Sequence, residues 1–368
     1  MARVKADDAA MEPLANAPRI SVLVVDDSKV LRMLLVHLLE SDPEIRVIGA
    51  VDDGHAALAF VKRDKPDVIL MDIHMPGLDG FETTRRIMET HPVPIVICSA
   101  TSDTRLVATT FRMMEVGAVA CVEKPVARDH ADFEALVTNL LQTVKLMSEV
   151  KVVRRWVRTR STLASAPPAS LETVAGRRSN GISLIGVGTS TGGPPVLQTI
   201  LGALPKEFPV PILIVQHIAA GFLPGLAEWL SQTTGFQVQI ASHGVSPMPG
   251  HVYLAPDEFQ MGVGAHGEIL LAKDAAEGGL RPAVSYLFRS LAQRFGPRAT
   301  GVLLTGMGKD GAAELKLMRD AGAVTIAQDR ESSVVHGMPG EAVRLDAATH
   351  VLPADKIASA LLTLTERR

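Results

Sequence analysis

Residues 183–195 read SLIGVGTSTGGPP, and this stretch decides how the second half of the chain folds. Its first residues are apolar or small, glycines and hydroxyls then interrupt the run, and apolar residues at helical spacing follow over 196–201. This order predicts a strand, a tight turn and a helix. Within the turn, Gly188, Ser190 and Gly192 form a G-x-S-x-G motif, whose glycines let the backbone bend and leave space for a substrate above the hydroxyl.

The same turn has competing interpretations. A dinucleotide-binding fingerprint requires G-x-G-x-x-G, but Thr191 stands where the third glycine after Gly186 and Gly188 belongs. A P-loop requires a lysine before its final hydroxyl residue, and this turn has none. On the motif alone, a nucleophilic serine, a turn that holds a phosphate or nucleotide, and a purely structural corner all stay open.

Length and composition limit the class of protein. The 368 residues are enough for two domains, because single domains mostly have about 100–200 residues. The formal net charge of -3 gives no reason to expect nucleic-acid binding. The two cysteines, Cys98 and Cys121, are too few for a disulfide framework, and no apolar run has the length of a signal peptide core or a membrane span. We therefore expect a cytoplasmic protein without membrane insertion.

The first half of the chain alternates apolar runs with helical patterns. Its first run, ISVLVV at 20–25, is apolar throughout, as expected for a strand buried on both faces of a parallel sheet. Further strands are predicted at 46–51, 68–71, 95–98 and 118–122. Helices are predicted after a Ser28 cap and near 55–63, 81–89, 104–116 and 129–146. This alternation predicts an α/β domain with a doubly wound parallel sheet.

Charged and hydroxyl side chains follow four of these strands. Asp26 and Asp27 come after the first strand, Asp72 after the third, Ser99 after the fourth and Lys124 after the fifth. In a doubly wound sheet the carboxyl ends of the strands form the ligand site. Three carboxylates gathered there repel one another unless a cation joins them, and hard oxygen ligands suit Mg²⁺. We expect a phosphoryl group beside a magnesium ion, with the lysine and the hydroxyl close to it.

The domain that these residues predict resembles the receiver domain of bacterial response regulators. The resemblance rests on VLVVDDS, MDIHMPGLDG, SA at 99–100 and EKP at 123–125. It implies that Asp72 accepts a phosphoryl group from a histidine kinase and that Asp26 and Asp27 help it to bind Mg²⁺. It also implies that Lys124 pairs with the phosphoryl group and that Ser99 moves to contact it.

A connector separates the two halves of the chain. Pro, Ala, Ser and Thr dominate the middle of 141–180, which is the composition of a flexible linker. We therefore expect a receiver domain over 19–140 and a second α/β domain over 181–368, again with a doubly wound parallel sheet.

Three residues of the second domain have the chemistry of a hydrolase triad. Strands predicted at 183–188, 211–215 and 301–304 end just before Ser190, His217 and the loop with Asp310. A serine is a poor nucleophile without a base, a histidine supplies that base, and a carboxylate orients the histidine. This set of residues predicts acyl-transfer chemistry.

The chain order of this triad leaves other bases to consider. The order Ser, His, Asp differs from the Ser, Asp, His order of α/β-hydrolases, in which His336 or His350 would be the base. His350 precedes a short apolar run that predicts an edge strand, which favours a structural role. His336 lies beside a glycine turn, and such a turn can face the site of Ser190, so His336 stays open as an alternative base.

The second half resembles the chemotaxis response-regulator protein-glutamate methylesterases, the CheB family. The stretches that carry the resemblance are IGVGTSTGG, IVQHIAAGF, YLAPDEFQM, LLTGMGKDGA and VVHGMPGEA. It implies hydrolysis of γ-glutamyl methyl esters on chemoreceptors and deamidation of glutamines, without a cofactor. The resemblance also implies the role of each triad residue: Ser190 is the nucleophile, His217 is the general base and acid, and Asp310 is the orienting carboxylate. The amides of Thr191 and Met307 are candidates for the oxyanion hole.

These expectations combine into an esterase that phosphorylation at Asp72 controls, acting in a chemotaxis or other chemosensory two-component pathway. Two other classes of protein compete with it. A receiver with a DNA-binding output would need a basic recognition helix, which the second half lacks. An oxidoreductase would use the turn around Ser190 to bind a nicotinamide cofactor.

Overall fold

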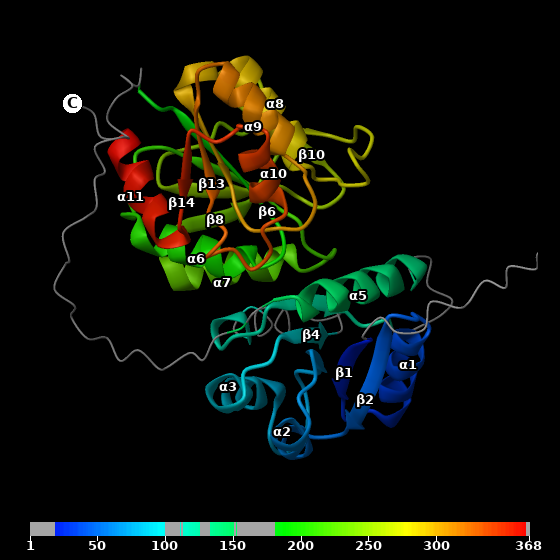
Figure 1. The fold of residues 1–368 in the computed structure, drawn as a ribbon. Coiled ribbons are helices and arrows are strands. Elements are labelled where there is room, and N and C mark those ends of the chain that lie inside the picture. The colour runs from blue at the N-terminus through cyan, green and yellow to red at the C-terminus, as the bar shows by residue number, and fades with distance from the viewer. Residues whose placement is uncertain are drawn as a thin grey trace, which may run out of the picture.

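The computed structural model describes residues 19–99, 111, 113–125, 133–150, 152 and 181–365, which form two α/β domains (Figure 1). The receiver domain contains β1 (Ile20–Val25), α1 (Lys29–Glu40), β2 (Ile45–Val51), α2 (Gly54–Arg63), β3 (Val68–Met71), α3 (Gly80–Thr90), β4 (Ile95–Ser99), β5 (Ala120–Glu123) and α5 (Phe133–Ser148). The five strands are parallel in the order β2-β1-β3-β4-β5. This confirms the predicted doubly wound sheet.

The two faces of β1 explain its continuous apolar sequence. Leu23 and Val25 pack into one core of the receiver domain, and Val22 and Val24 pack into the core on the opposite face. Ser28 caps α1 as predicted, because its side chain accepts a hydrogen bond from the Leu31 amide. Of the helix predicted at 104–116, residues 111 and 113–115 are helical, and the other positions up to 112 lie outside the described residues.

The last receiver helix bears on the domain limits. α5 runs to Ser148, and its Val144 and Met147 are fully buried against the receiver sheet. We therefore propose that the linker begins after this helix, a few residues later than the predicted start at 141, and its remainder lies outside the described residues.

The second domain is built on a seven-stranded parallel sheet in the order β14-β13-β12-β6-β7-β9-β8. Its strands are β6 (Leu184–Thr189), β7 (Ile212–Gln216), β8 (Gln237–Ile240), β9 (His251–Leu254), β12 (Ala299–Leu303), β13 (Val324–Gln328) and β14 (His350–Leu352). The strands predicted around Ser190, His217 and Asp310 are confirmed as β6, β7 and β12. They are adjacent, with β6 between the other two.

Helices cover both faces of this sheet, as the doubly wound prediction requires (Figure 1). One face carries α6 (Gly193–Ala203), α7 (Leu223–Thr234) and α11 (Ala354–Thr365). The other carries α8 (Val284–Arg294), α9 (Ala312–Asp320) and α10 (Met338–Arg344). An antiparallel hairpin of β10 (Gln260–Val263) and β11 (Ile269–Ala272) packs on α8 and was not predicted. Among the described helices, none has the length and apolarity to cross a membrane.

Candidate active site and phosphorylation site

The sheet register places the predicted nucleophile and base side by side. Thr189 at the end of β6 pairs with Gln216 at the end of β7, so Ser190 and His217 are the next residues on neighbouring strands. The His217 amide donates a hydrogen bond to the Thr189 carbonyl at 2.9 Å. On the other side of β6, Gly188 pairs with Leu303, the last residue of β12. The loop after β12 carries Asp310, so all three predicted residues lie at the same edge of the sheet.

The turn around Ser190 is fixed by its backbone. The Ser190 amide donates to the Thr305 carbonyl at 3.0 Å, and the Ser190 carbonyl accepts from the Gly193 amide at 2.9 Å. Gly192 adopts a φ of 77°, a left-handed conformation that favours glycine, and Gly193 begins α6. Gly188 has a different role from the one predicted: a Cβ there would lie 2.2 Å from Val284 Cγ1, so this glycine lets α8 approach β6.

His217 and Asp310 are in contact, whereas Ser190 Oγ stands apart from both. His217 Nε2 lies 3.0 Å from Asp310 Oδ2, although the two atoms are not aligned as a hydrogen bond. Among the described residues, Ser190 Oγ makes no hydrogen bond. Because Nε2 faces the carboxylate, Nδ1 is the ring nitrogen that stays available as a proton acceptor. Catalytic hydrogen bonds are often loose before the substrate binds.

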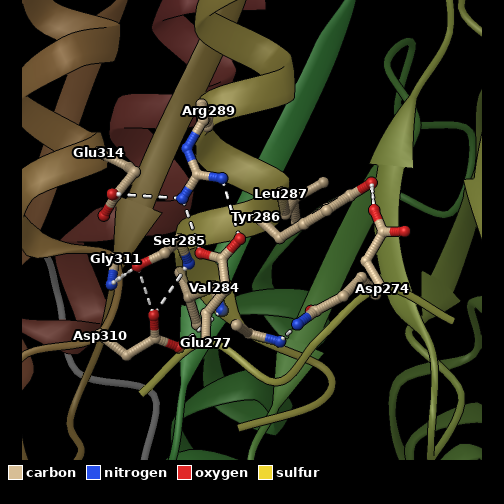
Figure 2. A network of polar contacts seen from close by, with 12 residues as sticks. Asp274, Glu277, Val284, Ser285, Tyr286, Leu287, Arg289, Asp310, Gly311 and Glu314 are labelled. Carbon is tan, nitrogen blue, oxygen red and sulfur yellow. Dashed lines mark hydrogen bonds and ion pairs between the residues drawn. The ribbon is translucent and has the colours of Figure 1, made fainter. Parts of the chain in front are cut away.

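The Asp310 carboxylate sits on the N-terminus of α8 (Figure 2). Its Oδ2 accepts from the Val284 amide at 2.6 Å, and its Oδ1 accepts from the Ser285 amide at 3.0 Å and from Ser285 Oγ at 2.5 Å. α8 has no capping side chain of its own at Ala283, so Asp310 caps this helix from a distant loop. Burial alone raises the pKa of the Asp310 carboxyl, but the contacts with His217 and Ser285 outweigh it and hold the pKa below its usual value.

Ser285 is a site residue that the sequence analysis missed. Besides holding Asp310, its hydroxyl oxygen accepts a hydrogen bond from the Gly311 amide at 3.0 Å. One turn further along α8, Arg289 pairs with Glu277 at 2.6 Å and lies 3.6 Å from Glu314 of α9 (Figure 2). The signal in the sequence that could have identified Ser285 is its place in the first turn of a helix that begins without a capping side chain.

Of the two amides predicted for the oxyanion hole, that of Thr191 lies in the serine turn and that of Met307 lies in the loop after β12. Within the described part of the chain, neither the Thr191 nor the Met307 amide is paired with an acceptor. The Met307 side chain is 43% exposed, so its loop faces solvent at the sheet edge. Their part in an oxyanion hole stays a prediction.

His336 and His350, the alternative bases of the sequence analysis, lie in different parts of the second domain. His350 begins the edge strand β14, which two strands separate from β6 and its serine turn. His336 forms a bridge with Gly306 at the loop after β12, so its backbone lies near the serine turn. Burial lowers the pKa of His336, and nearby Arg330 adds to this effect.

The predicted phosphorylation residues come together at the carboxyl edge of the receiver sheet. Carboxylate oxygens of Asp26, Asp27 and Asp72 all lie within 4.8 Å of one another, a spacing that one cation can bridge. Lys124 Nζ lies 2.8 Å from Asp26 and 2.8 Å from Asp72, and all three of these residues are buried. Ser99 is also buried, and its carbonyl accepts a hydrogen bond from the Lys124 amide at 3.0 Å.

Burial and ion pairing have opposite effects on the pKa values of Asp72 and Lys124 in this cluster. Burial raises the pKa of the Asp72 carboxyl above its usual value, and the pairing with Lys124 offsets only part of the shift. For Lys124, burial lowers the pKa, but the ion pairs with Asp26 and Asp72 outweigh it and raise the pKa. The lysine therefore carries a positive charge that is directed at the carboxylate of Asp72.

Comparisons with known proteins match both domains. The CheB methylesterase family matches residues 185–361, and the response regulator receiver domain family matches residues 22–137. A protein-glutamate methylesterase/protein-glutamine glutaminase of Nitrosospira multiformis is 53% identical over 95% of this chain and 98% of its own. One of Syntrophus aciditrophicus is also 53% identical, over 94% of this chain and 98% of its own.

Solved structures are similar to each half. The catalytic domain of Thermotoga maritima CheB methylesterase covers 50% of this chain and 98% of its own at 39% identity, with a TM-score of 0.48. The response regulator domain of T. maritima CheB covers 36% of this chain and 98% of its own at 34% identity, with a TM-score of 0.33. Given the identity over nearly the full length of its relatives, the chain belongs to the protein-glutamate methylesterase/protein-glutamine glutaminase family, hydrolases that carry a receiver domain.

Proposed function

We propose that the chain hydrolyses γ-glutamyl methyl esters on chemoreceptors and that Ser190, His217 and Asp310 carry out the reaction. The observation that carries this proposal is the contact between His217 and Asp310 beside a serine on the adjacent strand end. The names of the relatives support the substrate class.

The chemistry follows from the positions of these groups. Ser190 Oγ attacks the ester carbonyl carbon while His217 takes the hydroxyl proton, and the amides of Thr191 and Met307 stabilise the oxyanion. Protonated His217 then gives the proton to the departing methoxide, so methanol leaves and an acyl-serine remains. Water, deprotonated by His217, attacks the acyl-serine and releases glutamate. Asp310 stabilises the imidazolium in both steps.

The same residues suit a glutamine side chain, as the relatives' second name suggests. The first step then breaks the C–N bond of the carboxamide, and His217 protonates the nitrogen so that ammonia leaves. The acyl-serine is identical in the two reactions, so one site serves both substrates.

The receiver domain adds control by phosphorylation. We propose that Asp72 accepts a phosphoryl group from a histidine kinase and that Lys124 and Ser99 contact the transferred group. The three carboxylates of Asp26, Asp27 and Asp72 fit a Mg²⁺ ion, because clustered carboxylate oxygens are its preferred protein ligands. When bound, the ion neutralises charge on the phosphoryl oxygens.

Contacts between the domains support a route for this control. Phe111 of the receiver domain stacks on Trp229 of α7 with ring centroids 5.7 Å apart. Glu115 accepts hydrogen bonds from Trp229 Nε1 at 2.9 Å and from Gln198 of α6 at 3.0 Å. In Figure 1, α6 and α7 are the helices of the second domain that lie toward the receiver domain. Cys121 of β5 packs against the receiver core and against the cluster in which Phe111 and Met114 join the apolar residues of α6 and α7.

The same interface reaches the loop beside the serine turn. Val334 and Val335 pack against the receiver core. The Val335 amide also donates a hydrogen bond to the Thr305 hydroxyl at 3.0 Å. Val334 lies against Gly192 of the serine turn. We propose that the unphosphorylated receiver covers the mouth of the Ser190 site and that phosphorylation at Asp72 weakens this contact.

Loss of Ser190 tests the hydrolytic role. Hydrolysis of a glutamyl methyl ester on a receptor peptide lowers the peptide mass by 14 Da, the mass of CH₂, and mass spectrometry can follow this loss. We expect the wild-type chain to hydrolyse the ester about a thousandfold or more faster than Ser190→Ala. Ser183→Ala is the matched control, because Ser183 is an exposed serine on the same segment. Hydrolysis by Ser190→Ala at the wild-type rate would show that Ser190 is not the nucleophile.

A further inference from the structure

We infer that Gln216 is a positioning residue that holds the nucleophile and the base in register and orients the oxyanion donor. The inference rests on the proposed function of Ser190 and His217 and adds a residue to it. Gln216 is the last residue of β7 and is only 4% exposed.

The Gln216 amide joins the backbones of both reacting residues. Its Nε2 donates to the Ser190 carbonyl at 2.9 Å and to the His217 carbonyl at 2.8 Å. The opposite orientation of the amide would point Oε1 at two carbonyl oxygens, so the chemistry of the neighbours fixes which atom is the donor. One side chain thereby sets the distance between the serine turn and the histidine.

The bond to the Ser190 carbonyl also acts on the Thr191 amide. These two groups belong to one planar trans peptide unit, so the C=O and the N–H point in opposite directions. The Ser190 carbonyl is held on one side by Gln216 and by the Gly193 amide, which leaves the Thr191 N–H turned away from both. Hydrogen bonds accepted by a carbonyl polarise the N–H of the same peptide, so Gln216 both aims and strengthens this donor.

The packing around Gln216 shows that the turn is built to receive this side chain. A Cβ on Gly193 would lie 2.4 Å from Gln216 Oε1 and 2.3 Å from Thr189 Oγ1, so the absence of a side chain at 193 makes room for the amide. Within the described residues, the buried Oε1 has no hydrogen-bond partner. An unpaired buried acceptor costs stability, so the packing of the side chain alone does not favour a glutamine here. The donors, and not the packing, explain a glutamine at this position.

Two substitutions separate the donors from the shape of the side chain. Gln216→Met keeps the length and removes both donors, and Gln216→Glu keeps the shape and removes the Nε2 donors. With the full chain, a phosphoryl donor and a glutamyl methyl ester peptide, we expect kcat to fall about a hundredfold in Gln216→Met, the lower end for loss of one oxyanion donor. KM should stay within about threefold of the wild-type value, because the ground-state ester makes little use of these groups. Gln216→Glu should lose at least as much.

The control is Thr325→Val, which removes a buried hydroxyl near the start of β13, bonded to the Ala347 carbonyl at 2.7 Å. It should lower Tm without changing kcat. Unchanged kcat in Gln216→Met, or a fall that matches its loss of folded protein, would overturn the positioning role. Ser190→Ala distinguishes the proposed function from the role of Gln216. Hydrolysis by Ser190→Ala at the wild-type rate would refute the proposed function. An inactive Ser190→Ala together with a fully active Gln216→Met would refute only the role of Gln216.

Discussion

Asp310 serves two purposes with one carboxylate, because it contacts His217 and caps the uncapped start of α8. Ser285 connects the two roles. Its amide and hydroxyl both donate to the carboxylate oxygen Oδ1, which leaves Oδ2 beside the imidazole. The start of α8 therefore sets the orientation of the Asp310 carboxylate.

Ser285→Ala should lower kcat/KM by about tenfold, since a hydrogen bond to a charged group contributes roughly 1.5–3 kcal/mol, of which catalysis uses a part. Without the hydroxyl, the lowered pKa of Asp310 rises toward its usual value. The Asp310 carboxylate of this variant then takes up a proton at a higher pH than in the wild-type chain, so the acidic limb of the kcat/KM profile should move to higher pH.

The pH profile of Ser290→Ala is the control for this experiment. Ser290 lies on the same helix and donates to the Leu287 carbonyl, remote from Asp310. An acidic limb that stays in place in Ser285→Ala would show that the hydroxyl has no influence on the triad.

The sequence predicted Ser190, His217 and Asp310 because each follows an apolar strand, and strand ends of a parallel sheet converge. Ser285 and Gln216 were not predicted. Their roles depend on contacts between segments about 26 positions apart, such as Ser285 with Asp310 and Gln216 with Ser190, and no local pattern encodes such a contact.

At the level of elements, two glycines of β6 decide how close α8 lies to the sheet. A Cβ on Gly186 would lie 2.4 Å from Leu291, and one on Gly188 would lie 2.2 Å from Val284. Because Val284 and Ser285 hold Asp310, the packing of α8 on β6 determines where the carboxylate lies.

Gly188→Ala should therefore lower stability and activity together. Overpacking of this kind costs about 1–3 kcal/mol, and displacement of α8 moves the partners of Asp310 away from His217. Thermal unfolding and ester hydrolysis provide the two readouts. Gly202→Ala is the matched control, since nothing lies within 4 Å of a Cβ at this exposed position of α6. Alanine also has a higher helix propensity than glycine. Wild-type Tm and activity in Gly188→Ala would contradict this explanation of the glycine.

Strands buried on both faces were predicted most accurately, because their apolar runs are continuous. β1 and β3 have the predicted limits, at Ile20–Val25 and Val68–Met71. The hairpin of β10 and β11 escaped prediction because its strands have only four residues each and lie against a helix instead of in the main sheet.

At the scale of the whole molecule, one interface joins the receiver domain to the hydrolase domain. The sequence predicted both domains and the residues of the phosphorylation site. It did not predict the interface, because the contacts of Phe111 and Glu115 with Trp229 join segments more than 100 positions apart and form only when both domains have folded. Control of Ser190 by Asp72 is the central claim.

The most direct test measures methanol release from a glutamyl methyl ester peptide by the full-length chain, with and without acetyl phosphate and Mg²⁺. Asp72→Asn, which cannot be phosphorylated at this position, is the comparison. The account predicts that the phosphoryl donor raises the rate of the wild-type chain about tenfold or more and leaves Asp72→Asn at the basal rate. An equal rate with and without the donor in the wild-type chain, or equal stimulation of Asp72→Asn, would contradict it.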